Sequence, residues 1–283
     1  MGRLSYLLLT FALIPSGRNL RPGNKTQPDK SPRVEQSPEV LPSGYETPVS
    51  SSLFFTLQLR LGDEMGNIFS RTISYKGDSF PELALRVSGT GVYKVTNNDV
   101  ENPVFEGWFH YDGRPASHYH HIKVTDRGSY VGYDTTPSLN TDASGLMYNS
   151  FIWGTPPATL KKGDTWSVDI RGPWELGGPG KQTITVMDID EKNNTIRLKR
   201  EGSGEGYFDN DYKQVTITRN GGPLKMALTP GAAHWVGFTS FKNGLVVSDE
   251  LLVSRPVTLT AGDLKYMAFQ REYILLNDMP VPI

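Results

Sequence analysis

From Leu53 onwards the chain alternates apolar and polar residues in short runs, and this two-residue period is the feature that most constrains its fold. Successive side chains of a β-strand point to opposite faces, whereas an amphipathic helix repeats about every 3.6 residues. No stretch long enough for a stable amphipathic helix shows the helical period. The runs are bounded by Gly, Asn and Asp, which favour turns. The pattern therefore predicts an all-β domain.

The predicted strands share this alternation and an enrichment in β-branched and aromatic residues. They span residues 53–61, 68–76, 83–89, 92–97, 104–111, 118–125, 129–135, 149–154, 164–170, 182–190, 194–201, 213–220, 224–229, 234–241, 244–253, 256–260 and 264–276.

Three connections carry residues typical of tight hairpins: "DEKNN" at 190–194, "NGG" at 220–222 and "KNG" at 242–244. Asn and Gly adopt the positive φ angles that such turns require. Neighbouring strands are therefore expected to pair antiparallel in sequence order, as a long meander. Such a meander protects its edges by forming a curved sheet, a barrel or a two-sheet sandwich, and the pattern leaves these three open.

The N-terminal region is predicted to direct export. Residues 1–17 have a positive charge at Arg3, an apolar stretch, then Pro15 and small residues, which is the organisation of a signal peptide; the alternative is a buried or amphipathic N-terminal segment. Residues 18–52 are rich in Pro, Ser and charge, and are expected to form a disordered, flexible linker. The remaining residues, 53–283, are expected to form a single all-β domain of a secreted or periplasmic protein without a transmembrane anchor.

Composition excludes several classes of function. The formal net charge is -1 and the sequence pI is about 6.5, so no strong positive field attracts nucleic acid. Cysteine is absent, which excludes disulfides, thiolate metal sites and thiol nucleophiles. No Walker, G-x-G-x-x-G or G-x-S-x-G motif is present. The turn "KKGDTW" at 161–166 resembles short sequence segments of exported bacterial β proteins, including periplasmic lipid-carrier-like folds.

Four of the five histidines lie in "HYDGRPASHYHHIKV", residues 110–124. Alternation places His118 and His120 on one face of a strand, and a hairpin register that pairs His110 with His118 adds a third imidazole. A register slipped by one residue moves His110 to the opposite face. Three imidazoles with an open position form the arrangement of a catalytic zinc site.

The H-x-H spacing resembles that of cupins and of α-class carbonic anhydrases. The resemblance is limited to this spacing, because no glutamate follows at the cupin interval and Asp126 is the first acidic residue after the cluster. The other interpretation is a hairpin whose histidines are surface residues. His234 beside Trp235 is interpreted as a packing residue rather than a ligand.

Other residues suggest further sites. Glu201, Glu205, Asp249 and Glu250 are candidate carboxylates for a glycan-acting enzyme, which uses a pair of acids separated by roughly 5 to 9.5 Å. Large aromatic rings line many concave binding sites, although most are expected to belong to the core. The candidate ligand-binding residues are Trp108, Trp153, Trp174 and Trp235, with Trp174 expected to be exposed in the loop "RGPWELGGPG".

Two hypotheses of function follow. The first is an exported, non-catalytic β-rich binding or structural protein of the envelope or extracellular space, without a cofactor, which holds a small apolar molecule, a glycan or an envelope component. The second is a metal-dependent hydrolase of the zinc type, centred on His110, His118 and His120.

Overall fold

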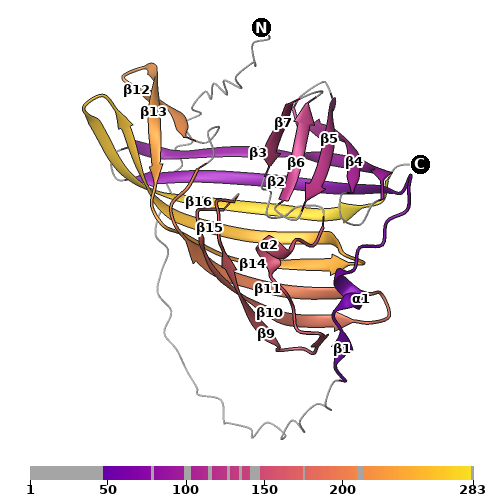
Figure 1. Ribbon diagram of the computed structural model, residues 1–283. Helices are drawn as coiled ribbons and strands as arrows, with labels where there is room; N and C mark the ends of the chain where they lie inside the picture. Colours follow the sequence, from indigo (N-terminus) through magenta and orange to yellow (C-terminus); the bar gives the residue numbers. More distant parts are fainter. Residues whose placement is uncertain are drawn as a thin grey trace, which may run out of the picture. The chain divides into compact units, whose positions relative to one another are not determined.

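The computed structural model describes residues 47–77, 80–98, 103–113, 117–125, 128–133, 136–140, 147–174, 176–208 and 213–281, with backbone pairing alone for the strands between 117 and 140. Residues from Tyr45 to Ile283 form one compact unit. It is built almost entirely of antiparallel strands (Figure 1). The predicted all-β class is confirmed. The predicted signal peptide, and the predicted linker up to residue 46, lie outside the described residues.

The strands form one 14-stranded sheet and a separate two-stranded one. Their bounds are β1 Val49–Ser50, β2 Glu64–Gly77, β3 Phe80–Asn97, β4 Val104–Tyr111, β5 Ser117–Thr125, β6 Gly128–Tyr133, β7 Thr136–Asn140, β8 Thr159–Leu160, β9 Thr165–Ile170, β10 Gly180–Asp190, β11 Thr195–Gly204, β12 Gln214–Arg219, β13 Gly222–Pro230, β14 Ala233–Lys242, β15 Leu245–Ala261 and β16 Leu264–Met279.

The strand order of the large sheet is β7-β6-β5-β4-β3-β2-β16-β15-β14-β11-β10-β9, while β12 pairs with β13 and β13 pairs with β15. Most neighbours in sequence are thus neighbours in the sheet, as expected of a meander. The pairing of β16 with β2 joins the C-terminal half to the N-terminal half. No pairing among the described residues connects β7 with β9, so the sheet is open and the predicted alternative of a closed barrel is not adopted.

The predicted hairpin turns are confirmed. Asn220 and Gly221 between β12 and β13 both have positive φ, of 50° and 79°, and Asn243 and Gly244 between β14 and β15 have 52° and 79°. Two consecutive positive φ angles define the turn whose twist matches that of the strands it joins. Asn194 ends the longer connection between β10 and β11 with φ of 52°. These turns place the three hairpins in register.

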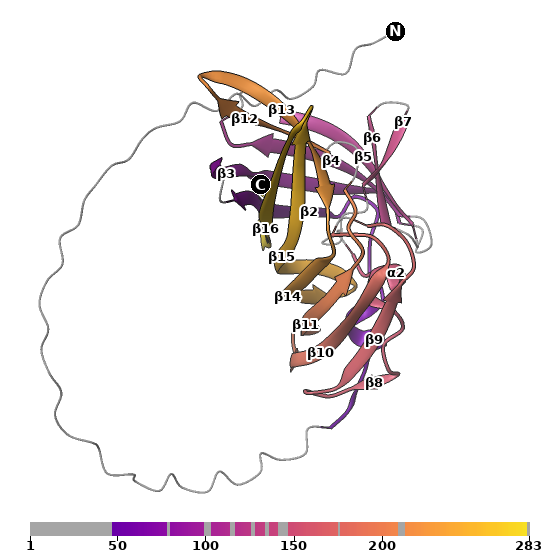
Figure 2. The same cartoon turned by 90° about the vertical axis from the view of Figure 1, so that its left-hand side faces the viewer.

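Two predicted strands are instead short helices. The predicted strand 53–61 begins within α1 (Ser52–Phe55) and continues as irregular backbone, and residues 149–154 contain α2 (Ser150–Trp153). The side chain of Asn149 accepts a hydrogen bond from the backbone N–H of Phe151, which caps the start of α2. Short apolar runs do not distinguish a strand from a buried helical turn, and here packing against the sheet decides. Figure 2 shows α2 against one side of β9.

The strand β15 continues through a proline. Its pairing with β14 ends at His234 opposite Ser254, and its pairing with β13 begins at Pro230 opposite Val257. Pro256 lies between the segment of β15 that pairs with β14 and the segment that pairs with β13, so its missing N–H costs no hydrogen bond of either ladder. The carbonyl of Pro256 accepts a hydrogen bond from the N–H of Gly231. The two predicted strands 244–253 and 256–260 are therefore one strand.

The main core lies on the face of the sheet that α1 and α2 cover, called here the inner face; the opposite side is the outer face. Phe54 of α1 and Trp153 of α2 pack over inward-facing residues of β9, β10, β11, β14, β15 and β16. Trp235 lies across β11, where a Cβ atom on Gly202 would come within 2.7 Å of the indole. The glycine therefore makes room for the ring on the inner face.

Candidate functional surface

The outer face carries large apolar side chains in contact with solvent. Val236 of β14, Leu252 of β15 and Tyr273 of β16 are directly opposite one another in the ladder and are 36%, 42% and 37% exposed. Two further residues of β16 follow at two-residue steps, Phe269 at 43% and Met267 at 62% exposed. Because alternate residues share a face, all five lie on the outer face. We call Val236, Leu252, Met267, Phe269 and Tyr273 the apolar stripe.

The stripe is not required by the core. The inner face of the same strands is already apolar and closed, with Trp235, Leu251 and Val253 all 2% exposed or less. An antiparallel sheet with one solvated face normally alternates apolar and polar residues, so β14 to β16 depart from the pattern at the centre of the sheet. Contiguous exposed apolar groups on a folded domain mark interaction surfaces.

Basic side chains lie beside the stripe on β2, β3 and β16. Lys76 of β2 is the direct ladder partner of Phe269, and Arg271 lies between Phe269 and Tyr273 on β16. Arg86 of β3 is opposite Thr72, which is itself opposite Tyr273. Lys265 precedes Met267 by two residues on the same face. All four are exposed. We call Lys76, Arg86, Lys265 and Arg271 the basic rim.

One acidic residue contacts the stripe. The Tyr273 hydroxyl donates a hydrogen bond of 2.9 Å to Glu250 Oε1 on the neighbouring strand. Partial burial, followed by this hydrogen bond and the nearby negative charge, raises the pKa of the Tyr273 phenol. The contact holds the tyrosine ring in place at the edge of the stripe.

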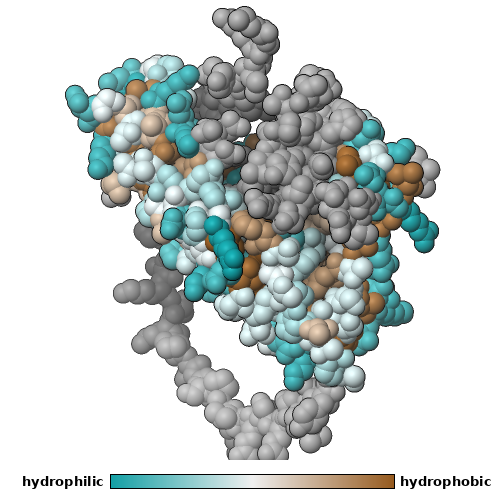
Figure 3. Space-filling model, in the orientation of Figure 1, coloured by the Kyte–Doolittle hydropathy of each residue, from teal (hydrophilic) through white to brown (hydrophobic). Residues whose placement is uncertain are grey.

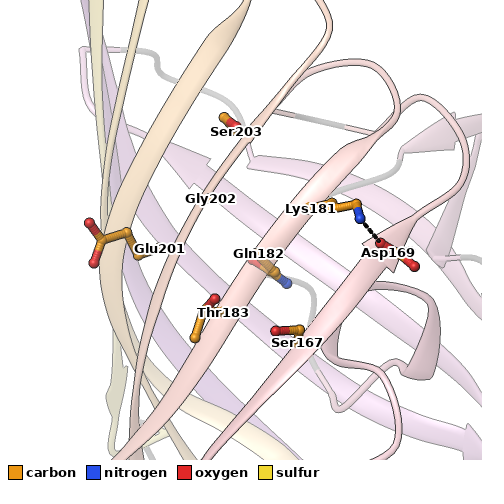
Figure 4. A pocket seen from close by; sticks show the side chains of 8 residues that line it. All are labelled: Ser167, Asp169, Lys181, Gln182, Thr183, Glu201, Gly202 and Ser203. Carbon is orange, nitrogen blue, oxygen red and sulfur yellow. Dashed lines mark ion pairs between the residues drawn. The ribbon is translucent and has the colours of Figure 1, made fainter.

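A shallow pocket of about 410 Å³ lies over β9, β10 and β11. It is lined by Ser167, Asp169, Lys181, Gln182, Thr183, Glu201, Gly202 and Ser203 (Figure 4). Figure 4 shows Lys181 and Asp169 facing each other at one side and Glu201 at the other. The ion pair between Lys181 and Asp169 has a distance of 3.5 Å. Glu201 is itself paired with Lys199 at 2.7 Å. The charges of this pocket are thus matched in pairs, and its lining is hydrophilic.

The inner face holds buried polar groups among its aromatic rings. The indole N–H of Trp235 donates to Gln182 Oε1 at 3.1 Å, and Gln182 Nε2 donates to the carbonyl of Ile152 in α2. Figure 3 shows that, on the side carrying α2, brown apolar areas are separated by teal and white ones. The hydrogen bonds of Gln182 with Trp235 and with Ile152 attach α2 to the sheet, which is a structural role.

The predicted tryptophan residues separate into two groups. Trp153 and Trp174 are 1% exposed and Trp235 is 2% exposed, so all three belong to the core. The prediction that Trp174 is exposed is wrong: its loop folds back, and its ring meets that of Trp235 edge to face with centroids 5.0 Å apart. Trp108 is 39% exposed and shares the outer face with the stripe, since its ladder partner is Val92. Whether these residues bind a ligand stays a prediction.

The histidine hairpin has the slipped register. His110 is opposite Ser117, and His118 is opposite Phe109, so the backbone pairing that three imidazoles on one face require is absent from β4 and β5. The side chains of His118 and His120 lie outside the described part of the structure. Within the described part, no three His, Asp or Glu side chains form a metal-binding group. Zinc binding stays a prediction, which the metal content of His118→Ala and His120→Ala variants tests.

The candidate carboxylates do not meet in one cleft. Asp249 is fully buried and paired with Arg200, Glu250 is bound by Tyr273, and Glu201 is paired with Lys199. Glu205 is exposed in the segment after β11. The acids therefore have separate structural surroundings rather than a shared substrate position.

The alternation in the sequence contained the signal for the apolar stripe. In "LKYMAFQREYILL" both sets of alternate residues of β16 are largely apolar or aromatic, which indicates a strand with two apolar faces. Two members of the basic rim, Lys265 and Arg271, alternate with the stripe in the same segment of β16. Lys76 and Arg86 come from β2 and β3, and only the pairing of β16 with β2 and of β2 with β3 brings them beside it.

Comparisons with known proteins leave the family undefined. No family model and no curated protein matches the chain. Among solved structures, the chain is similar to Ail, the attachment invasion locus protein of Yersinia pestis, with 7% identity, a TM-score of 0.16, and coverage of 77% of this chain and 99% of that chain. It is also similar to Salmonella typhi OmpF in complex with daunomycin, with 8% identity, a TM-score of 0.19, and coverage of 77% and 97%. At these TM-scores neither likeness informs fold or function.

The helices of the structure are short. Among the described residues, none is long and apolar enough to cross a membrane.

Proposed function

We propose that this chain is an exported, non-catalytic binding protein of the cell envelope, and that its ligand binds to the outer face of the open sheet. The apolar stripe is the observation that carries this proposal. Five large apolar side chains on three adjacent strands are exposed at the centre of the sheet, while the inner face of the same strands is closed by its own core. Binding of an apolar partner that covers such a surface lowers the free energy, because it removes the apolar side chains from water.

The stripe supports binding rather than catalysis. It consists of side chains without nucleophilic or acid–base groups, apart from the Tyr273 phenol, whose pKa is raised further above neutral pH by burial and by Glu250. Three carboxylates of the outer face, Asp169, Glu201 and Glu250, are engaged in ion pairs or a hydrogen bond. An apolar surface of this kind gives affinity through desolvation, and neighbouring polar groups give orientation.

The test is the binding of a neutral hydrophobic dye, Nile red, to the full chain. The double variant Leu252→Ser/Phe269→Ser is expected to reduce the fluorescence gain of the dye several-fold, because each serine removes an apolar contact at about 25 cal/mol per Å². Leu61→Ser is the matched control: Leu61 is 67% exposed, but lies in a loop before β2. Equal dye binding by the double variant and the wild type contradicts the proposal.

Export rests on the signal-peptide pattern of residues 1–17 and needs its own test. In a bacterial host, the full chain is expected in the envelope fraction with a shortened N-terminus, whereas a variant that lacks residues 1–17 stays in the cytoplasm. A cytoplasmic location of both proteins, with the N-terminus of the full chain intact, contradicts export and leaves the dye experiment unaffected.

A further inference from the structure

We infer that the outer face docks on an anionic lipid bilayer surface, with the apolar stripe entering the interfacial region and the basic rim contacting lipid phosphates. This inference rests on the proposed function and names the partner of the same face. It is carried by the position of the four cations relative to the five apolar side chains.

The cations lie beside the apolar residues in the ladder itself. Lys76 pairs with Phe269, and Arg271 stands between Phe269 and Tyr273. Neighbouring strands lie about 4.8 Å apart and alternate residues about 6.6 Å apart, so each cation is one or two side-chain spacings from an apolar one. Long basic side chains bury their methylene stems against apolar material and keep the charge at the surface. Phosphates above the stripe are within their reach.

The charge balance of the outer face differs between its two halves. Over β9 to β11 the acids are matched, Asp169 with Lys181 and Glu201 with Lys199. Glu64 on β2 lies 4.0 Å from Lys94 on β3, away from the stripe. Within the described ranges, no ion pair involves any member of the basic rim. The apolar half of the face carries the four cations of the basic rim, and Glu250 is the acid in contact with the stripe, so this half has an excess of positive charge.

A bilayer fits this combination better than the other occupants. A second copy of the chain, docked face to face, brings a second basic rim against the first, and like charges then oppose association. A neutral glycan offers no partner for four cations and little to exposed aliphatic groups such as Leu252 and Met267. Interfacial binding to lipid uses aromatic and aliphatic side chains together with Lys and Arg that face anionic headgroups.

The net charge of -1 does not oppose this inference. Electrostatic attraction to a membrane surface falls off within a Debye length, about 8 Å at physiological ionic strength. The membrane therefore responds to the local charges of the docking face and not to the sum over the chain.

The test is co-sedimentation of the full chain with vesicles. We expect binding to phosphatidylcholine vesicles that contain about a quarter of phosphatidylglycerol, weakening as salt is added, and little binding to phosphatidylcholine alone. The double variant Lys76→Gln/Arg271→Gln is expected to bind the anionic vesicles about 30-fold more weakly, and Lys76→Arg/Arg271→Lys is expected to retain binding. The matched control Lys181→Gln/Lys199→Gln removes two charges of the same face from existing ion pairs, and binds like the wild type.

Each result decides the inference. Equal binding to both kinds of vesicle, absence of binding, or the same loss in both double glutamine variants overturns it. Self-association that Leu252→Ser/Phe269→Ser abolishes, with no binding to vesicles, assigns the face to a second copy instead. In these cases reduced Nile red binding by the stripe variant still supports the proposed function, so the two failures are distinguishable.

Discussion

Arg200 of β11 and Asp249 of β15 form an ion pair across the intervening strand β14, and neither side chain is exposed to solvent. Arg200 Nη2 donates to both carboxylate oxygens, at 2.8 and 2.6 Å, and Thr239 Oγ1 of β14 donates to the same carboxylate. The guanidinium lies over the ring of Trp153, 5.0 Å from its centroid. The pair therefore connects three strands with the helix that covers them.

Breaking this pair is expected to be costly. In Asp249→Ala the Arg200 charge stays buried without its partner, which lowers the free energy of unfolding by about 3 to 5 kcal/mol. The measurement is the urea unfolding midpoint. Asp169→Ala breaks the Lys181–Asp169 pair, whose side chains are 83% and 65% exposed, and is expected to leave the midpoint nearly unchanged. Equal midpoints for both variants contradict a structural role for the buried pair.

Gly202 is expected to tolerate no larger residue. A Cβ atom there would lie 2.5 Å from the carbonyl oxygen of Lys181 and 2.7 Å from the indole of Trp235. Gly202→Ala should therefore destabilise the fold by about 1 to 3 kcal/mol, seen as a lower Tm. Gly172→Ala is the control, since its nearest neighbour is a ring atom of Phe151 at 3.6 Å. An unchanged Tm for Gly202→Ala speaks against the described packing of Trp235 on β11.

Tyr75 is expected to make stability depend on alkaline pH. Burial raises the pKa of Tyr75 to about 12 from 10.0, although the hydrogen bond from Gln270 acts in the opposite direction. Between these values the unfolded chain loses the phenol proton while the native state keeps it, so stability falls as pH rises from about 10 to 12. The slope contributed is at most about 1.4 kcal/mol per pH unit. Urea unfolding across this range should show a shallower decline for Tyr75→Phe, and an identical decline contradicts the assignment.

The tryptophan residues should differ in access to quenchers. Trp153, Trp174 and Trp235 are almost completely buried, whereas Trp108 is 39% exposed. Trp108→Phe is expected to lower the fraction of fluorescence that acrylamide quenches in the native protein, and Trp174→Phe is expected to raise it, because it removes a protected emitter. The opposite result for Trp174→Phe means that its loop does not pack on Trp235.

How far the sequence predicts this fold depends on the range of the interactions involved. The hairpin at Asn220 and the one at Asn243 follow from local φ preferences, and both were predicted. The helix at Ser150–Trp153 was not, since a four-residue apolar run has no distinguishable period and its conformation depends on the sheet it covers. Trp174 shows the same limit, because a loop rich in Gly and Pro gives no indication of the cavity its ring fills.

The candidate site shows the limit more clearly. The apolar members of β16 are visible in its alternation, and the chemistry of each histidine and tryptophan is evident from the residue type. The sequence does not show which of these residues come together in the fold. A shift of one residue between β4 and β5 separates His110 from His118, and the pairing of β16 with β2 brings Lys76 beside Phe269 from almost 200 positions away in the chain, residue 76 to residue 269.

The sequence by itself determined that this chain is all-β, where its tight turns lie, and that it lacks cysteine chemistry, because strand period, turn preference and composition are local properties. The tertiary structure alone decided that the sheet stays open, which face each strand turns to the core, and which charges lie beside the apolar stripe. These depend on register between distant strands, and a register changes every neighbour of a side chain without changing any local preference.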